Sequence, residues 1–295
     1  MTKAAYSTGA GRGQTLVEGE FLFTNEDFAS IAGMLYDDAG IALSESKASL
    51  VYSRLAKRLR ALGLESFRDY CKFVAGSEGV NERMNMLAAL TTNVTRFFRE
   101  PHHFEHLKTK VLPDLVASAR ARGRVRIWSA GCSTGQEPFT IALTVLEALP
   151  EAANFDIRIL ATDIDPNVVA TGRAGVYSNE AVEPVPAALR DRWMVRVRDN
   201  GRESWGAGDE MRRLVAFREL NLMGNWPMKG RFDVIFCRNV VIYFDEPTQA
   251  RIWSRFAPLL NPGGRLYVGH SERVTDMDRF DTDGLTAYRL KGGPR

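Results

Sequence analysis

Residues 125–138 constrain the fold of this chain more than any other stretch. They begin with an apolar pattern at 125–128 that is typical of a buried strand. Small residues follow at 129–135, and these let the backbone turn sharply and approach a ligand closely. Residues 139–149 then carry apolar side chains at helical spacing. A strand, a tight loop and a helix in this order predict the first unit of a nucleotide-binding α/β sheet.

The same loop lacks the motifs that bind pyrophosphate. It has neither the G-x-G-x-x-G spacing of dinucleotide-binding folds nor the Gly-Lys-Ser/Thr ending of a phosphate loop. Glu137 lies at the start of the predicted helix, where the helix dipole favours a carboxylate. The sequence therefore leaves two roles open for Glu137: it caps the helix, or it binds a cationic or hydroxyl-bearing ligand.

The second predicted strand, residues 155–163, ends in an acidic residue, Asp163. At the end of the second strand of a doubly wound sheet, a carboxylate can accept hydrogen bonds from the ribose hydroxyls of an adenosine. The alternative role for Asp163 is to cap the following helix. Without a pyrophosphate motif before it, the ligand that fits best is an adenosine without phosphates, and S-adenosylmethionine meets that description.

Composition limits the other possibilities. A chain of 295 residues favours two domains, each with its own core. No apolar run reaches the roughly 18 residues of a membrane span, and the first twenty residues lack a secretory signal, so we expect a cytoplasmic protein with no direct membrane insertion. Cys71, Cys132 and Cys237 are too scattered for a zinc site, and we expect no metal. A net charge of +3 does not predict nucleic-acid binding.

The first part of the chain is predicted to be helical. Residues 1–22 have little apolar periodicity and predict a disordered tail. Residues 23–92 predict an all-helical domain whose first helix is capped by Thr24 or Asn25 and ended by Gly40. Further helices are predicted within residues 44–62, 66–75 and 82–90.

One of these helices is strongly basic. Residues 51–62 form an apolar stripe at helical spacing, flanked by cations with no acid between them. These cations are Arg54, Lys57, Arg58 and Arg60. They form either an ordinary solvated face or an electrostatic docking surface for an acidic partner.

Residues 93–295 complete the α/β domain. The polar, aromatic stretch 91–101 indicates an interdomain joint or a ligand-facing loop. Residues 177–217, including an apolar run at 214–217, predict an inserted hairpin or small antiparallel sheet. Residues 232–237 predict a central strand with Arg238 and Asn239 at its carboxyl end, where open α/β sheets bind ligands. Residues 286–290 predict a final edge strand.

Taken together, these motifs resemble the bacterial chemotaxis receptor glutamate methyltransferases, the CheR family. The resemblance runs from residue 24 to residue 290 with the motifs in the right order. The matching segments are residues 91–100, 129–138, 161–165, 221–222, 236–240, 242–245 and 269–272. It implies an α/β fold class, in which an all-helical N-terminal domain precedes a Rossmann-like, S-adenosylmethionine-dependent methyltransferase domain with a small inserted antiparallel β subdomain.

The resemblance also implies roles for individual residues. The residues expected to bind S-adenosylmethionine are Asn93, Thr95, Arg99, Glu137, Asp163, Asn221, Leu222, Arg238 and Asn239. Arg99 and Tyr243 are expected nearest the transferred methyl, as the catalytic residues. The basic helix corresponds to the helix that docks the cytoplasmic helical region of methyl-accepting chemoreceptors. The product of the cofactor would be S-adenosylhomocysteine.

The chemistry of this reaction agrees with the residues present. A glutamate side chain has a reference pKa of about 4.3, so it is already an anion at neutral pH and its methylation needs no general base. The four histidines are therefore expected in surface or capping roles, not catalytic ones. Residues 198–208 do not reproduce the glycine pattern of relatives that bind a receptor C-terminal pentapeptide, so we expect docking without it. We also expect a monomer.

Two other functions remain open from the sequence. The first is a methyltransferase that acts on a small molecule or on RNA, which the adenosine-binding loops alone would allow. The second is a non-catalytic adaptor that binds S-adenosylmethionine and docks through its helical domain.

Overall fold

The computed structural model describes residues 15–91, 93–199 and 201–292. The chain forms two compact units, with the boundary between Thr92 and Asn93. Each unit has its own core of buried apolar residues. No helix within the described ranges is long and apolar enough to cross a membrane.

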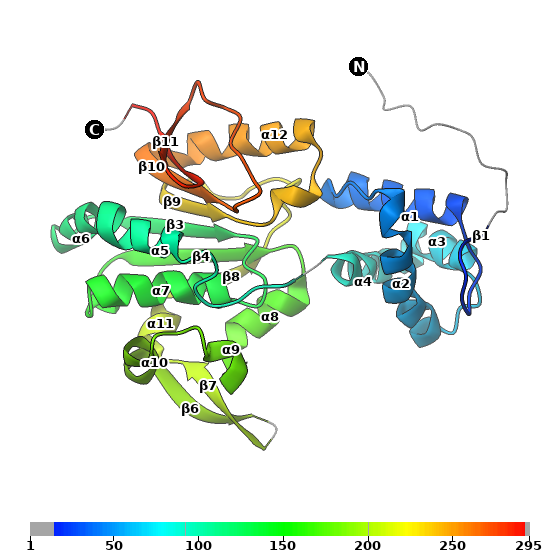
Figure 1. Ribbon diagram of the computed structural model, residues 1–295, viewed down its shortest axis with the longest axis horizontal. Coiled ribbons are helices and arrows are strands. Elements are labelled where there is room, and N and C mark those ends of the chain that lie inside the picture. The colour runs from blue at the N-terminus through cyan, green and yellow to red at the C-terminus, as the bar shows by residue number, and fades with distance from the viewer. Residues whose placement is uncertain (1–14, 92, 200, 293–295) are drawn as a thin grey trace. The chain divides into compact units, whose positions relative to one another are not determined.

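The first unit is a small helical domain (Figure 1, blue to cyan). Its described elements are β1 (Thr15–Val17), β2 (Phe23–Thr24), α1 (Asn25–Ala39), η1 (Glu45–Lys47), α2 (Ala48–Leu62), α3 (Phe67–Ala75), η2 (Ser77–Gly79) and α4 (Val80–Leu90). The predicted helices are all present. Thr24 forms a capping box with Asp27 at the start of α1, and Gly40 ends that helix with a φ of 70°.

The N-terminal tail differs from the expectation. Residues 15–17 form the strand β1, which pairs antiparallel with β2, so the expected disorder of residues 1–22 does not extend to this part of the chain. Phe21 packs edge-on against Phe67, and its amide donates to the hydroxyl of Tyr52 at 3.0 Å. These contacts hold residues near 21 against the helices. Residues 1–14 lie outside the described residues.

The second unit is built on a seven-stranded sheet in the order β11-β12-β10-β9-β3-β4-β8. The strands are β3 (Val125–Ala130), β4 (Ile157–Asp163), β8 (Val215–Glu219), β9 (Phe232–Cys237), β10 (Leu260–Val268), β11 (Phe280–Gly284) and β12 (Ala287–Leu290). Neighbouring strands from β10 to β8 are parallel, whereas β12 is antiparallel to both of its neighbours. The predicted final strand is therefore present, but β11, not β12, is the edge.

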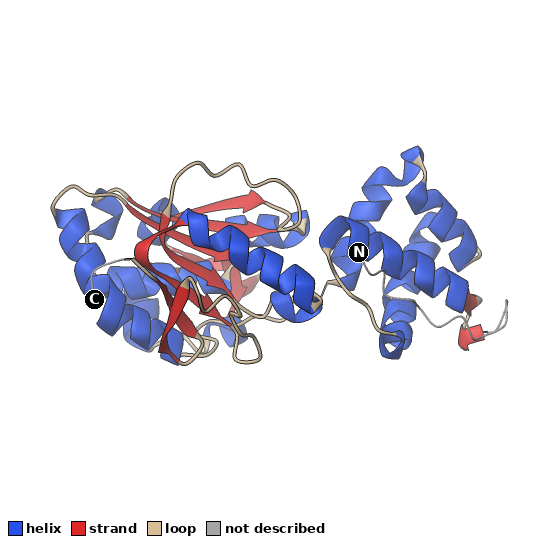
Figure 2. Ribbon diagram, turned by 90° about the horizontal axis from the view of Figure 1, so that it is seen from above, coloured by secondary structure: helices blue, strands red, loops and turns tan. Residues whose placement is uncertain are grey.

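Helices cover both faces of this sheet (Figure 2). The helices are α5 (His102–His106), η3 (Leu107–Val111, a π-helical turn), α6 (Leu112–Arg120), α7 (Gln136–Ala148), η4 (Ala152–Asn154), α8 (Pro166–Ala174), α11 (Asp209–Leu214), η5 (Val241–Tyr243), α12 (Glu246–Phe256) and η6 (Ala257–Leu259). Alternate residues of β3 divide between the two cores, because successive side chains of a strand point to opposite faces. Ile127 packs in the cluster with α7, and Trp128 packs in the cluster with α12.

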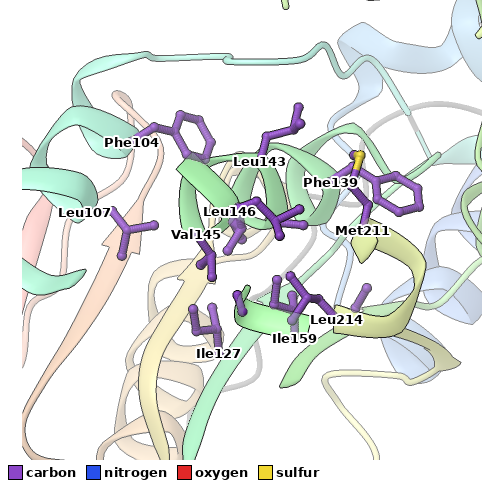
Figure 3. Packing of buried hydrophobic residues seen from close by; sticks show 14 of the residues in the cluster. Phe104, Leu107, Ile127, Phe139, Leu143, Val145, Leu146, Ile159, Met211 and Leu214 are labelled. Atoms are coloured by element: carbon purple, nitrogen blue, oxygen red, sulfur yellow. The ribbon is translucent and has the colours of Figure 1, made fainter. Parts of the chain in front are cut away.

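Figure 3 shows the first of these cores, where the apolar residues of α7 lie over the strand residues Ile127 and Ile159. The residues labelled there from other helices are Phe104, Leu107, Met211 and Leu214, all of which are buried. Burial of a Leu, Ile or Phe side chain contributes roughly 1.5–3 kcal/mol. This core fixes the strands whose carboxyl ends carry the site.

The insertion is a three-stranded antiparallel sheet in the order β5-β7-β6 with two short helices. Its elements are β5 (Val176–Ser178), α9 (Asn179–Val182), α10 (Ala187–Trp193), β6 (Met194–Asp199) and β7 (Arg202–Ala207). The assignment of residues 214–217 to this sheet was wrong. Leu214 ends α11, and residues 215–217 lie in β8, which pairs in parallel with β4 and packs Phe217 against Phe139. The small sheet therefore ends at Ala207.

Candidate functional site

The site is built from loops that follow β3, β4, β9 and β10 at the carboxyl edge of the sheet. The β3 loop contains two glycines with positive φ, 85° at Gly131 and 95° at Gly135. A Cβ atom on Gly131 would lie only 2.2 Å from Cγ2 of Val240, in the β9 loop. Glycine is therefore required where these two loops meet, because it alone combines this backbone angle with this approach.

Asp163, at the end of β4, is buried and receives two backbone amides. Its Oδ2 accepts from the amide of Ser133 at 2.7 Å, and its Oδ1 accepts from the amide of Asp165 at 3.1 Å. Burial raises its pKa, and these hydrogen bonds oppose the rise. Asp165, not Asp163, is the N-cap of α8. The capping alternative for Asp163 is thus excluded, and its remaining lone pairs are able to accept ligand hydroxyls.

Asn93 joins this cluster from the segment that precedes α5. Its side-chain amide donates to Oδ2 of Asp165 at 3.2 Å, and its carbonyl accepts from the hydroxyl of Ser133 at 3.2 Å. The carboxyl ends of β3 and β4 and residue 93 are therefore connected. Thr95 is half-buried in the same segment.

Glu137 lies in the first turn of α7 but does not cap it with its side chain; the N-cap is Gly135. Its Oε1 accepts from the Ser129 hydroxyl at 2.8 Å, and its Oε2 lies 3.0 Å from Nη1 of Arg238. Burial raises the pKa of Glu137, while the Arg238 charge acts in the opposite direction. The main partners of Glu137 within the chain are therefore on β3 and after β9.

Arg238 connects three parts of the site although its side chain is only 2% exposed. Besides Glu137, its guanidinium donates to the carbonyl of Arg99 and lies 3.4 Å from Oε2 of Glu100. Oε1 of Glu100 in turn lies 2.9 Å from Nδ1 of His270 and 3.4 Å from Nδ2 of Asn239. A continuous chain of charged and polar contacts thus links the first turn, the Arg99 segment and the β9 and β10 loops.

Arg99 lies between two residues with left-handed backbone, Phe98 with a φ of 52° and Glu100 with a φ of 56°. Such angles are uncommon for residues other than glycine, especially for a bulky aromatic. The Phe98 amide donates to the Thr140 hydroxyl at 3.2 Å, and Nη1 of Arg99 donates to the carbonyl of Val94 at 2.8 Å. The segment is thereby tied both to α7 and to itself.

The loop after β9 carries Asn239 and Tyr243 and is held by one buried carboxylate, Glu272. The oxygens of Glu272 accept from the backbone amides of residues 239–242 at 2.8 to 3.3 Å and from the amide of Gly269 at 2.5 Å. Tyr243 is half-buried in η5 at the end of this turn. Glu272 therefore fixes the backbone that leads to Tyr243.

Asn221 and Leu222 follow β8, next to Leu220, whose amide donates to the carbonyl of Asp163 at 2.9 Å. The side-chain oxygen of Asn221 accepts from the Met223 amide at 2.8 Å, and Leu222 is 8% exposed in the apolar cluster with α12. Of the predicted cofactor residues, the structure connects Arg99, Glu137, Arg238 and Asn239 through direct contacts or one intermediate residue. Asp163 is connected to Asn93 through Ser133.

Sequence reasoning assigned no ligand-binding or catalytic role to several residues that organise the site, namely Ser129, Ser133, Glu100, Asp165, His270 and Glu272. Glu100 and Glu272 lay inside motifs that carried the resemblance, and this was the available signal. The expectation for the histidines was wrong at His103. His103 is fully buried, and its Nε2 lies 2.8 Å from the hydroxyl of Thr286. Burial lowers the pKa of His103 to about 3.

Most of the basic residues of α2 contact other parts of the first unit. Arg58 forms an ion pair with buried Glu82, and Arg60 forms one with Glu20. Arg54 donates to the carbonyls of residues 89–91 at the end of α4. Lys57 is exposed. Acids from other parts of the first unit therefore offset part of the positive charge of this helix.

One group of side chains has the spacing of a metal site. Glu100, His102 and His103 offer ligand atoms that all lie within 4.8 Å of one another. Arg238 already places a positive charge 3.4 Å from the Glu100 carboxylate. Because a cation there would be repelled by the guanidinium, we assign no metal to this group.

Glu100 gives a pH-dependent contribution to stability. Burial acts to raise its pKa, but the His270 hydrogen bond and the Arg238 charge outweigh burial and lower the pKa from 4.5 to about 2. The side chains that face it are Arg238, His103, His270 and Asn239. A lowered pKa stabilises the folded state above pH 4.5, and this contribution is lost as the pH falls towards 2.

We therefore expect the difference in unfolding free energy between the parent chain and Glu100→Gln to be constant from pH 8 to about pH 5.5 and to shrink steadily below it. Urea unfolding at a series of pH values measures this difference. A difference that stays the same down to pH 3 would contradict an ionised, paired Glu100.

Comparison with known protein families matches both units of the chain. Residues 26–91 match the CheR methyltransferase, all-alpha domain, and residues 93–289 match the CheR methyltransferase, SAM binding domain. The two matches together cover most of the sequence.

Individual relatives agree with this match. The chain is 58% identical over 258 residues to a probable chemotaxis protein methyltransferase of Rhizobium etli, covering 87% of this chain and 96% of that protein. It is 46% identical to chemotaxis protein methyltransferase 2 of Pseudomonas aeruginosa, with 91% of this chain and 94% of that protein covered. It is 39% identical to the chemotaxis protein methyltransferase of Escherichia coli, with 89% of this chain and 90% of that protein covered. The chain therefore belongs to the CheR methyltransferase family, as an all-alpha domain followed by a methyltransferase domain of the S-adenosylmethionine-binding type.

Proposed function

We propose that this chain transfers a methyl group from S-adenosylmethionine to glutamate side-chain carboxylates of methyl-accepting chemoreceptors, forming glutamate methyl esters and S-adenosylhomocysteine for chemotactic adaptation. The observation that carries the proposal is the buried Asp163 at the end of β4, oriented by the amides of Ser133 and Asp165. This is the position at which a doubly wound sheet presents a carboxylate to a ribose.

The charge of the site supports a cationic cofactor. Glu137 and Asp163 bring two carboxyl groups to this edge, and Arg238 compensates part of their charge. Excess negative charge in a largely buried site favours a ligand with positive groups. When bound, S-adenosylmethionine supplies an activated methyl on a sulfonium centre. The residues that would hold it are Asn93, Thr95, Arg99, Glu137, Asp163, Asn221, Leu222, Arg238 and Asn239.

The binding role of Asp163 gives a prediction. We expect Asp163→Asn to weaken binding of S-adenosylmethionine about tenfold or more, because the amide presents one acceptor oxygen in place of two. Calorimetric titration measures this effect. Asp209→Asn, an acid in the first turn of α11, serves as the control and should bind as the parent does. Equal affinity in Asp163→Asn would contradict the ribose role.

The proposed chemistry asks the chain for alignment rather than for proton transfer. The substrate carboxylate is already ionised, so the chain has to hold it in line with the transferred methyl and exclude water. Arg99 would bind a carboxylate of the cofactor or of the substrate, and Tyr243 would orient the attacking oxygen through its hydroxyl. No metal has a part in this scheme.

The role of Tyr243 is tested by removing only its hydroxyl. We expect Tyr243→Phe to lower turnover about tenfold and to change cofactor affinity less than about threefold, because the ring would remain in place while the orienting bond is lost. Turnover and calorimetric affinity are measured on the same preparation. Tyr288→Phe, in β12, is the matched control. Unchanged turnover in Tyr243→Phe would remove the orienting role.

The proposed partner is the cytoplasmic helical region of a chemoreceptor, whose glutamates suit a basic docking surface. Lys57 and Arg60 on α2 are exposed, whereas Arg54 and Arg58 are partly covered by their contacts within the unit. We propose that α2 docks the receptor, with Lys57 and Arg60 contributing most, without a pentapeptide tether. We further propose that the chain acts in the cytoplasm as a monomer, organised as residues 23–92 and 93–295.

The function is tested by mapping methyl groups on receptor-containing membranes incubated with the purified chain and S-adenosylmethionine. Peptide mass analysis should find single methyl groups on receptor glutamates. Methyl groups on a small molecule or on RNA would assign the chain to those substrates, and cofactor binding without methylation would favour an adaptor.

A further inference from the structure

Glu100 is the point at which the separate loops of the site meet. Its Oε2 lies 3.4 Å from Arg238 and 3.6 Å from Nδ1 of His103. Its Oε1 accepts from Nδ2 of Asn239 at 3.4 Å and from the amide of His270 at 3.3 Å, and lies 2.9 Å from the His270 ring. One carboxylate therefore contacts side chains from α5, the β9 loop and the β10 loop.

The position of Glu100 next to Arg99 gives this junction a direct effect on the proposed catalytic segment. Arg238, which lies beside the Glu100 carboxylate, also donates to the Arg99 carbonyl. The two residues that flank Arg99 both have left-handed backbone. A non-glycine residue keeps such a conformation only when the surrounding contacts over-determine it. The contacts of Glu100 are a large part of that restraint.

The surroundings of Glu100 favour a charged residue at position 100. The Arg238 guanidinium contacts the carboxylate of Glu137 through one nitrogen and the carboxylate of Glu100 through another. The side chain of Glu100 is 12% exposed and that of Arg238 is 2% exposed. In so dry a place a charged contact restrains geometry more strongly than the same contact in water.

We propose that Glu100 is a positioning residue for methyl transfer: by gathering Arg238, Asn239 and His270 it fixes the turn that carries Arg99. The part of this inference that concerns transfer rests on the proposed function. Glu100 itself touches neither methyl donor nor acceptor in this scheme; it acts through Arg99 and Arg238. Loss of its charge loosens the turn and leaves the binding residues present.

Three substitutions at position 100 distinguish the effect of the carboxylate from the effect of the left-handed backbone conformation. Glu100→Gln keeps the size and removes the charge. Glu100→Ala removes the side chain, and Glu100→Gly removes it while making the left-handed backbone easy to adopt. Glu105→Gln, an exposed glutamate on α5, is the matched control. If the carboxylate positions the turn, Glu100→Gly does not restore the activity that Glu100→Ala loses.

The first measurement is amide hydrogen exchange of the purified chain, which requires no substrate. We expect Glu100→Gln to accelerate exchange severalfold in residues 94–100, 238–243 and 269–272, with the strands of the sheet unchanged. Glu105→Gln should match the parent. Exchange in these three segments that is the same in Glu100→Gln as in the parent would overturn the proposal, whatever the activity of the chain.

The second measurement is receptor methylation together with cofactor affinity. We expect Glu100→Gln, Ala and Gly each to lower kcat between about tenfold and a hundredfold, with the affinity for S-adenosylmethionine within about threefold of the parent. Activity of Glu100→Gly at the parent level, with Glu100→Ala low, would show that only the backbone matters and would overturn the proposal. A parent chain that methylates no receptor, with faster exchange in the variants, would refute the proposed function and leave the positioning of the turn supported.

Discussion

Replacing Arg99 with alanine is expected to lower kcat/KM for receptor methylation by about a hundredfold or more, equivalent to roughly 2.7 kcal/mol of lost transition-state stabilisation. A guanidinium carries five N–H donors in a planar fork, so its bond to the Val94 carbonyl leaves others able to bind a carboxylate. Arg99→Lys should recover little of the loss, because an ammonium cannot reproduce bidentate binding.

The appropriate control is Arg96→Ala, which removes an exposed arginine three residues earlier in the same segment. We expect this variant to retain activity within about twofold, because an exposed side chain that takes no part in the network contributes little. Unfolding in urea shows whether each variant is folded, and steady-state kinetics at saturating cofactor separates kcat from KM. An Arg99→Ala enzyme within threefold of the parent would remove Arg99 from the catalytic assignment.

Replacing Arg238 with glutamine is expected to lower the free energy of unfolding by about 3–5 kcal/mol, since breaking a buried ion pair leaves uncompensated charge. The side chain of Arg238 is 2% exposed and is paired with both Glu137 and Glu100. Without it, two carboxyl groups would share a largely dry space. Burial already raises the pKa of Glu137, so we expect the variant to lose least stability at low pH, where that group is protonated.

Arg273→Gln, an exposed arginine on the loop after β10, is the control and should change the unfolding free energy by less than about 0.5 kcal/mol. Equilibrium unfolding in urea at pH 7 and pH 5 measures both variants. A loss below 1 kcal/mol for Arg238→Gln, roughly that of an exposed pair, would contradict its role as the charged link between the loops.

Local sequence signals predicted the elements that depend on neighbouring residues. The Thr24 cap, the glycine at position 40 and the apolar spacing of α2 are local, and each helix formed where it was expected. The strands ending at Asp163 and before Arg238 were also predicted, because parallel buried strands have a continuous apolar pattern. These strands place Asp163, Arg238 and Asn239 at one edge of the sheet.

Features that depend on distant residues were not predicted. Residues 214–217 were assigned to the insertion because they follow its hairpin, whereas the pairing of residues 215–217 with β4 is set by a strand more than fifty residues earlier. The acids that offset the basic helix, Glu20 and Glu82, come from other segments of the first unit. The burial of His103 likewise depends on Thr286, at the other end of the domain.

The contacts between residues of the site also depend on segments far apart in the sequence, and these contacts were not predicted. Sequence patterns indicated Glu137 and Arg238 separately as ligand contacts, but their pairing across two loops appears only in three dimensions. The contacts of Glu100 with Arg238, Asn239 and His270 span about 140 to 170 residues of sequence, so no local pattern could reveal them. Glu272 holds a turn some thirty residues earlier in the chain.

The central claim, methylation of receptor glutamates, is tested most directly by the alkali lability of the transferred methyl. Chemoreceptor-containing membranes are incubated with the chain and S-adenosylmethionine labelled in its methyl group, and the receptor is then treated with mild alkali. Carboxyl methyl esters hydrolyse and release volatile methanol, whereas methyl groups on nitrogen or on nucleobases remain attached. We predict receptor-bound label that is released as methanol, and its loss in Arg99→Ala. Alkali-stable label, or no label on receptors despite cofactor binding, would contradict the claim.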